Sequence, residues 1–200
     1  MIKNRIKNLR KLIEQNNLDG YIIPKNDAYF SEYSSPDRLK VITNFNGSAG
    51  FAIVLKKKNF LFVDGRYTIQ AQDQSGKLFK ILEIPKFSPK FILGNKSKKF
   101  ILGFDPQLFT SASLKNRFNN IFNLIPIDEN LIDKIYKKKS VKSVKQFYVL
   151  NDKIVGEKMT SKISKLVKIM KLKKIDNIFI SAPENVAWLL NLRGKDSPSS

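Results

Sequence analysis

The chain has 200 residues, of which 42% are hydrophobic, and it carries a formal net charge of +20 without any cysteine or histidine. This hydrophobic content suffices for the core of one or two domains, and the missing residue types exclude disulfides, thiolate nucleophiles and histidine-based metal or general-base chemistry. No apolar run reaches the roughly 18 residues of a membrane span, and charges throughout the N-terminal segment are unlike a secretion signal, so we expect a cytoplasmic protein without a membrane partner.

The large positive charge raises the question of nucleic-acid binding, because clustered lysines and arginines supply its sequence-independent part. Only six of the 37 basic residues are arginines, and the lysines form short groups at 56–58, 96–99 and 137–139, each beside an expected turn or helix end. This distribution favours a solvated lysine surface. A free-standing basic binding module, with nucleic acid as its ligand, is the alternative function, and binding that survives about 200 mM salt would support it.

The N-terminal segment predicts a helix followed by a strand. Apolar residues recur with polar residues between them at positions 2, 6, 9, 12 and 13, which is the spacing of an amphipathic helix. Asn and Gly in "NNLDG" (16–20) favour a helix end. The next residues, "YIIP" (21–24), are typical of a short buried strand.

The segment "VITNFNGSAGFAIV" (41–54) places a glycine-containing loop between two apolar runs, which we interpret as strands. A phosphate-binding P-loop needs Gly, four residues and Gly-Lys-Ser/Thr before a helix, and this loop has neither the spacing, nor the lysine, nor the helix. We therefore predict a structural turn. Gly47 and Gly50 supply its unusual backbone angles, while the side chains of Asn44 and Ser48 bind loop amides. An anion site is the less favoured alternative.

Two further apolar runs, "FAIVL" and "FLFV", flank a "KKKN" turn and predict a β-hairpin, and "DGRYTIQAQDQ" predicts a helix after it. Asp64, Arg66 and Tyr67 come together where the second strand ends. We favour a structural role in which Asp64 caps the helix and Arg66 pairs with a nearby carboxylate. The three residues are also kept as candidates for a pocket or interface, because a guanidinium at a strand end can bind a substrate carboxylate.

The remainder of the first half continues an α/β pattern. Strands are expected at "FKILEI" (79–84) and "KFILGF" (99–104), and helices within 105–122, capped by Asp105 or Thr110, and within 127–139. Alternating strands and helices predict a mixed sheet flanked by helices.

A metal site made from carboxylates alone is not expected in this chain. Asp27, Glu32 and Asp37 share one loop, but no expected helix carries paired acids at ligand spacing.

The sequence contains an internal repeat. Shifted by 157 residues, the apolar positions of the first helix fall on 163, 166, 169 and 170, and "LDGYII" falls on "IDNIFI" (175–180). At an offset of 147, "VITNFNG" falls on "WLLNLRG" (188–194), so that Asn44 matches Asn191 and Gly47 matches Gly194. The same three features in the same order indicate a duplicated fold unit. We expect the single tryptophan, Trp188, to lie in the core.

The repeat sets the expected domain organisation. We predict a first domain over 1–140, a linker over 141–156 and the incomplete start of a second, related domain over 157–200. The second copy has one helix, one strand and a short helical turn before Gly194, without a counterpart of "FAIVL" or "FLFV". These elements are too few to bury a sheet face independently, so we expect them to pack on the first domain or remain mobile.

Five motifs resemble, in order and spacing, the N-terminal half of the long Xaa-Pro aminopeptidases (aminopeptidase P): "RLKVITNFNGSAGFAIV", "FLFVDGRYTIQAQDQ", "FDPQLFT", "IPIDENLIDKIY" and "ISAPENVAWLLNLRG". The resemblance covers nearly the whole chain. It implies two related creatinase-type N-terminal domains, each an α/β sheet with covering helices, followed by a catalytic domain that holds two manganese ions. Phe109 stands where relatives usually have a histidine, at a position that is not catalytic in the family.

The resemblance also implies which part of the whole enzyme carries the catalytic residues. The whole enzyme would be a cytoplasmic, homodimeric metallopeptidase, a hydrolase that removes the residue before proline from short peptides. Its metal ligands and catalytic histidines belong to the catalytic domain, and their motifs are missing here, so no catalytic or metal residue is assigned to this chain. The segment itself would bind no cofactor and be inactive alone. Its expected partners are its own catalytic domain and a second subunit, and its expected role is to dimerise and to restrict access to the catalytic pocket.

Overall fold

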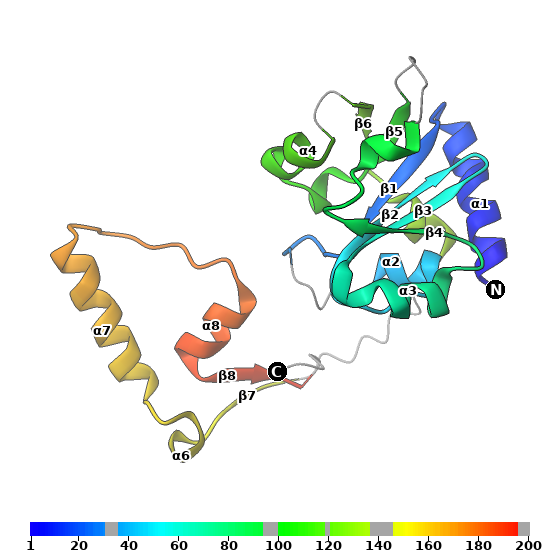
Figure 1. The fold of residues 1–200 in the computed structure, drawn as a ribbon. Coiled ribbons are helices and arrows are strands. Elements are labelled where there is room, and N and C mark those ends of the chain that lie inside the picture. Colours follow the sequence, from blue (N-terminus) through cyan, green and yellow to red (C-terminus); the bar gives the residue numbers. More distant parts are fainter. Residues whose placement is uncertain (31–35, 94–99, 119–120, 137–145, 196–200) are drawn as a thin grey trace. The chain divides into compact units, whose positions relative to one another are not determined.

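In a computed structural model, which describes residues 1–30, 36–93, 100–118, 121–136 and 146–195, the chain divides into two units, Met1–Lys139 and Ser140–Ser200 (Figure 1). We call them the first and the second unit. Within the described ranges, no helix combines the length and the apolar character needed to cross a membrane.

The first unit is built on a six-stranded sheet with the order β4-β3-β2-β1-β5-β6. β2 is antiparallel to both β1 and β3, whereas the pairs β3/β4, β1/β5 and β5/β6 are parallel. This confirms the expected mixed sheet. β6 was not predicted, because most of its residues are exposed and the alternation that marks a strand is missing. The strands are β1 Gly20–Pro24, β2 Gly50–Leu55, β3 Asn59–Asp64, β4 Lys80–Ile84, β5 Ile101–Phe104 and β6 Asn123–Pro126.

Helices cover both faces of this sheet (Figure 1). Successive strand side chains point to opposite faces, so each central strand contributes to two clusters. One cluster joins the strands to α1 (Ile2–Gln15), α2 (Arg38–Thr43), α3 (Thr68–Ser75) and α5 (Leu131–Ile135). The other packs the opposite face on α4 (Ser111–Phe118) and on the 3-10 turns Pro89–Leu93 and Pro106–Leu108. Both clusters are rich in fully buried aliphatic and aromatic side chains.

Helix boundaries in the first unit follow the expected capping residues. α1 ends at Asn16, and the left-handed Asn17 (φ 54°) follows it. Both caps proposed for 105–122 are used, because the Asp105 carboxylate accepts from the Gln107 amide, and Thr110 Oγ1 accepts from the Ser113 amide, 3.1 Å away. The capping side chains therefore bind amides that the helical turns leave unpaired.

The segment before the "NGSAG" loop is a helix rather than a strand. α2 begins after Asp37, whose carboxylate caps it by accepting from the Lys40 amide, and ends at Asn44, which adopts a left-handed φ of 73°. The loop therefore connects a helix to β2, and the strand expected over 41–43 is wrong. An apolar run of this length fits either element, and the Asp37 cap decided for a helix.

The second unit contains β7 Phe147–Val149, α6 Asp152–Val155, α7 Met159–Leu172, α8 Pro183–Leu190 and β8 Leu192–Gly194, and β7 pairs antiparallel with β8. The range expected as a linker, 141–156, thus includes β7 and α6, while 141–145 lie outside the described residues. The strand expected at 175–180 pairs with none of the described strands.

Candidate functional site

Asp64, Arg66 and Tyr67 lie together on the surface at the end of β3. Asp64 Oδ1 accepts from the Arg66 amide (3.0 Å) and from Arg66 Nε (2.8 Å), so the acid caps the 3-10 turn Gly65–Tyr67 and pairs with the arginine. The hydrogen bond from the Arg66 side chain holds the pKa of the Asp64 carboxyl below its usual range. The Arg66 side chain is 74% exposed, so the guanidinium is accessible from solvent.

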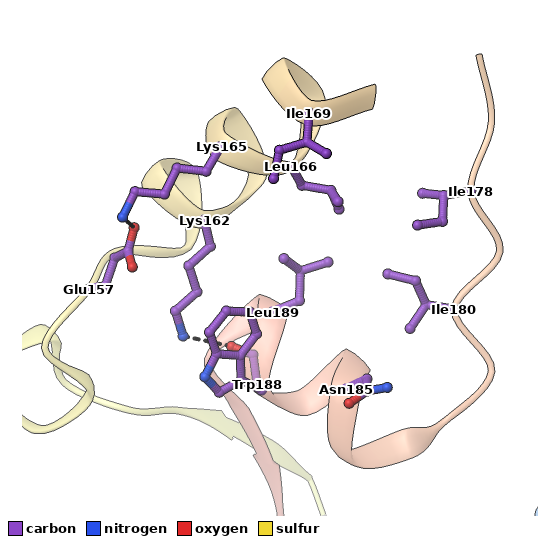
Figure 2. Close-up of a pocket in the computed structure, with 10 residues that line it drawn as sticks. All are labelled: Glu157, Lys162, Lys165, Leu166, Ile169, Ile178, Ile180, Asn185, Trp188 and Leu189. Carbon is purple, nitrogen blue, oxygen red and sulfur yellow. Dashed lines mark hydrogen bonds and ion pairs between the residues drawn. The ribbon is translucent and has the colours of Figure 1, made fainter. Parts of the chain in front are cut away.

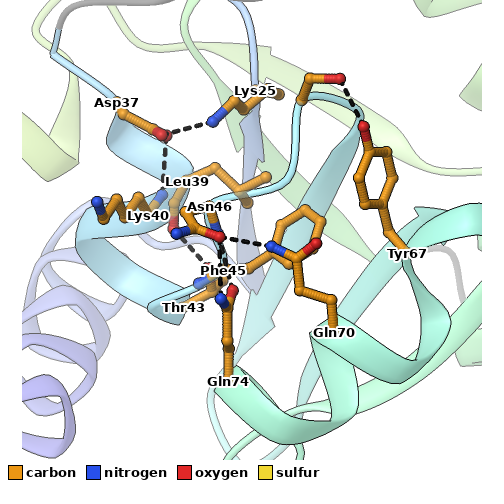
Figure 3. Close-up of polar contacts among 11 residues, drawn as sticks. Lys25, Asp37, Leu39, Lys40, Thr43, Phe45, Asn46, Tyr67, Gln70 and Gln74 are labelled. Carbon is orange, nitrogen blue, oxygen red and sulfur yellow. Dashed lines mark hydrogen bonds and ion pairs between the residues drawn. The ribbon is translucent and has the colours of Figure 1, made fainter.

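Tyr67 contacts the loop that follows α2 through both its hydroxyl and its ring (Figure 3). Its hydroxyl and Ser48 Oγ are 2.9 Å apart, and its ring meets the buried Phe45 edge-on, with 5.8 Å between the centroids. Gly47 lies against both rings, because a Cβ there would come within 2.3 Å of Phe45 Cζ and 2.9 Å of Tyr67 Cδ1. Gly47 is therefore required by this close approach. Of the two loop glycines, Gly50 has the left-handed backbone angle, with φ at 151°.

The loop amides are bound by residues that the sequence analysis missed. Thr43 Oγ1 accepts from the Phe45 amide (3.0 Å), and Gln74 Oε1 accepts from the Asn46 amide (3.0 Å). Gln70 and Gln74, one turn apart on α3, both donate to Asn46 Oδ1 (Figure 3). This corrects the roles given to Asn44, which ends α2 through its backbone, and to Ser48, which bonds a hydroxyl. The spacing of the two glutamines was the available signal.

The acids considered for a metal site have other roles. Asp37 pairs with Lys25 and caps α2, while Asp27 Oδ1 accepts from the Tyr29 amide, 2.9 Å away. Glu32 lies outside the described residues. Among the described ranges, no group of three or more acids is arranged to hold a metal ion.

The second unit has a largely apolar cavity of about 420 Å³ between α7, the segment 175–182 and α8, which we call the α7–α8 cavity (Figure 2). Trp188 on its wall is 59% exposed, so the expected core position of this residue is wrong. The cavity is lined by Glu157, Lys162, Lys165, Leu166, Ile169, Ile178, Ile180, Asn185, Trp188 and Leu189.

One buried cation ties α7 to the end of α8. Lys162 is 6% exposed, and its Nζ donates to the Trp188 carbonyl (2.8 Å) and to Asn191 Oδ1 (2.7 Å). The same ammonium lies 4.1 Å from the centroid of the Trp188 ring. At the rim, the hydrogen bond from Lys165 lowers the pKa of the Glu157 carboxyl.

The first unit contains the equivalent of this contact. Arg5 on α1, which precedes Lys162 by 157 residues, donates from Nη1 to the Val41 carbonyl at 2.9 Å. Val41 precedes Trp188 by the offset of 147 residues. Backbone details repeat as well, because α1 and α7 have the same length and are followed by left-handed residues at 17 (φ 54°) and 174 (φ 53°). The left-handed Asn44 likewise matches Asn191 (φ 53°). The repeat is therefore present in the structure as well as in the sequence. Lys162 is best explained as a structural residue that holds α7 to the end of α8.

Replacing Lys162 by methionine is expected to destabilise the second unit by about 1–3 kcal/mol, because the Trp188 carbonyl and Asn191 Oδ1 lose their donor. Lys162→Arg should retain most of the stability, since arginine makes this contact in the first unit. Urea unfolding followed by fluorescence of the single tryptophan measures both variants. Equal stability of the methionine variant and the unmodified chain would show that the hydrogen bonds of Lys162 do not stabilise the second unit.

Sequence comparison finds similarity to probable Xaa-Pro aminopeptidases. It is 32% identical to a probable Xaa-Pro aminopeptidase P of Fusarium vanettenii and 31% identical to that of Laccaria bicolor, over 98% and 96% of its length. The chain spans about a third of the length of these relatives, 33% and 32%.

Structural comparison points the same way. The X-prolyl aminopeptidase of Caenorhabditis elegans, described as a cytosolic enzyme with a di-nuclear active site, matches 99% of this chain with a TM-score of 0.77 and 25% identity, over 35% of its own length. The aminopeptidase P of Streptococcus thermophilus shares the fold at a TM-score of 0.52 and 19% identity, over 67% of this chain and 97% of its own.

Two sequence-family matches divide the chain at nearly the same place as the structure. Both are described as creatinase/prolidase N-terminal domains, and they cover residues 5–135 and 138–200. Because the first match alone extends over more than half of the 200 residues, the chain belongs to the creatinase/prolidase N-terminal domain family.

Proposed function

We propose that this chain is the non-catalytic N-terminal segment of a metal-dependent Xaa-Pro aminopeptidase. The observation that carries the proposal is its identity of about a third with aminopeptidase P relatives over nearly its whole length, which corresponds to only a third of theirs. Hydrolysis at a two-metal centre needs a dense set of metal ligands. The chain offers no histidine for such a set, so we assign the reaction, with two manganese ions, to another part of the enzyme.

The segment's own contribution is to organise the enzyme around that centre. We assign it the roles of joining two subunits in a cytoplasmic homodimer and of restricting the pocket to short peptides. Asp64, Arg66 and Tyr67 are our candidates for the contact surface, since they are held in place by the Asp64 cap and the Ser48–Tyr67 contact while Arg66 stays accessible. An accessible guanidinium that a neighbouring carboxylate positions suits the binding of a carboxylate of a peptide or a partner subunit.

Peptide hydrolysis tests this proposal. The purified 200-residue chain is expected to give no turnover of an Xaa-Pro peptide with Mn²⁺, whereas an enzyme in which the chain is joined to a catalytic domain cleaves it. In that enzyme, Arg66→Ala should raise either the KM for peptides or the dissociation constant of the dimer by about tenfold. A change of this size corresponds to the loss of one charge-assisted hydrogen bond.

The matched control is Lys57→Ala, which removes a cation from the exposed turn between β2 and β3. It should leave KM and dimerisation unchanged. Turnover by the 200-residue chain alone would refute the non-catalytic role. An Arg66→Ala enzyme with normal KM and normal dimerisation would remove Arg66 from the contact surface.

A further inference from the structure

Tyr67 connects the exposed Arg66 side chain to the interior of the first unit. Arg66 Cζ lies 5.5 Å from the centroid of the Tyr67 ring, a distance at which a guanidinium and an aromatic face attract each other. Arg66 Nε also donates to Asp64 Oδ1 at 2.8 Å. The guanidinium therefore contacts both a carboxylate and a ring, and its direction depends on how firmly each of them is held.

The Tyr67 ring is itself held by the "NGSAG" loop (46–50). Its hydroxyl lies 2.9 Å from Ser48 Oγ, and the ring packs edge-on against Phe45, which is 0% exposed. Tyr67 is thus fixed at its polar end by a hydrogen bond and along its ring by the core. Loss of the Ser48 contact would free the hydroxyl end of the ring on which Arg66 lies.

The loop is in turn fixed to α3, the helix that begins directly after Tyr67. Gln74 binds Asn46 twice, because its Oε1 accepts from the Asn46 amide at 3.0 Å and its Nε2 donates to Asn46 Oδ1 at 2.9 Å (Figure 3). At the end of α3, the buried Ser75 donates from Oγ to the Thr43 carbonyl at 2.8 Å. The loop therefore has a fixed position relative to α3 and to the turn that precedes it.

We propose that Ser48, acting through Tyr67, is a positioning residue for Arg66. The Ser48 hydroxyl fixes the ring, and the ring holds the guanidinium in the direction in which it binds a carboxylate. A binding side chain whose rotamer is already fixed loses less conformational freedom when its ligand binds. The "NGSAG" loop then contributes to binding without touching the ligand. The role of Ser48 rests on the role proposed above for Arg66 at the contact surface.

A double-mutant cycle in the enzyme that includes the catalytic domain tests this role. The readout is the constant that Arg66→Ala raises, either the KM for peptides or the dissociation constant of the dimer. Ser48→Ala and Tyr67→Phe each remove one hydroxyl of the pair. Each should raise that constant about threefold, the effect of one neutral hydrogen bond, and leave kcat unchanged. In the Arg66→Ala background, neither substitution should raise the constant further.

Ser113→Ala is the matched control. Ser113 Oγ donates to the Thr110 carbonyl at 2.8 Å on α4, so this variant also loses one hydroxyl hydrogen bond but none of the contacts of Tyr67. It should leave the constant unchanged with and without Arg66. Circular dichroism checks that all variants remain folded.

Proton exchange at Arg66 Nε, measured by NMR in the 200-residue chain, gives a second readout that needs no catalytic domain. The signal is identified by its loss in Arg66→Ala. Because a mobile Tyr67 ring lets the guanidinium leave Asp64 more often, Ser48→Ala and Tyr67→Phe should both speed up this exchange. Ser113→Ala should leave the exchange rate unchanged.

Three results would overturn the inference. The first is an Nε exchange rate that Ser48→Ala does not alter. The second is a normal binding constant in Ser48→Ala when Arg66→Ala raises it, and the third is a Ser48→Ala effect that persists in full without Arg66. If Arg66→Ala alters neither constant, the proposed contact surface is wrong, and the exchange rates decide separately whether Ser48 positions Arg66.

Discussion

Phe62→Ala is expected to lower the free energy of unfolding of the first unit by about 3–5 kcal/mol, the usual cost of deleting a fully buried aromatic ring. Phe62 is 0% exposed in the middle of β3 and stacks on Phe51 of β2, with 4.7 Å between ring centroids and 6° between their planes. Phe51 in turn meets the buried Phe118 of α4 edge-on at 5.8 Å. Deletion of the ring thus leaves a cavity between two strands and the helix that covers them.

The matched control is Phe91→Ala. Phe91 is 41% exposed, so removal of its ring creates little buried empty space. This variant should lose about 1 kcal/mol or less, as expected for a partly exposed site. Hydrogen exchange of the β2 amides measures both variants, since amides in the centre of a sheet exchange by global unfolding. Equal protection in the two variants would contradict the central position of Phe62 in the core.

Gly50→Ala is expected to destabilise the first unit by about 1–3 kcal/mol through backbone strain alone, with a steric cost added to it. Gly50 begins β2 with a φ of 151°, an angle that L side chains rarely adopt. A Cβ there would lie 2.7 Å from the carbonyl oxygen of Phe62 on the neighbouring strand. Because this neighbour is backbone held in the β2–β3 ladder, it cannot rotate away as a side chain can.

Gly65→Ala provides the comparison. The nearest atom to its Cβ would be Glu83 Oε1 at 3.2 Å, the end of a flexible side chain, so we expect a change within about 0.5 kcal/mol. Thermal unfolding followed by far-UV circular dichroism distinguishes the two variants. If both unfold at the temperature of the unmodified chain, the strained angle assigned to Gly50 is incorrect.

Most hydrogen-bond partners of the "NGSAG" loop could not be predicted from the sequence. The P-loop was excluded correctly, because a strand follows the glycines and the spacing and the lysine are missing. The partners of the loop amides were not found, since Gln74 on α3 reaches Asn46 across 28 residues of sequence. Such a bond depends on how α3 packs beside α2, which no local pattern encodes.

The sequence by itself determined the amphipathic α1, the β2–β3 hairpin, the helix caps and the duplication, because these follow from periodicity and spacing within short windows. The helix at 41–43 has a local cause, the Asp37 cap, which the sequence analysis overlooked. The tertiary structure alone decided that Trp188 is exposed, because burial depends on distant parts of the chain. Burial of an apolar face needs a partner surface. The β2–β3 hairpin supplies it in the first unit, and the described residues of the second unit include no equivalent hairpin. Similar apolar spacing is therefore buried in the first unit and more exposed among the described residues of the second.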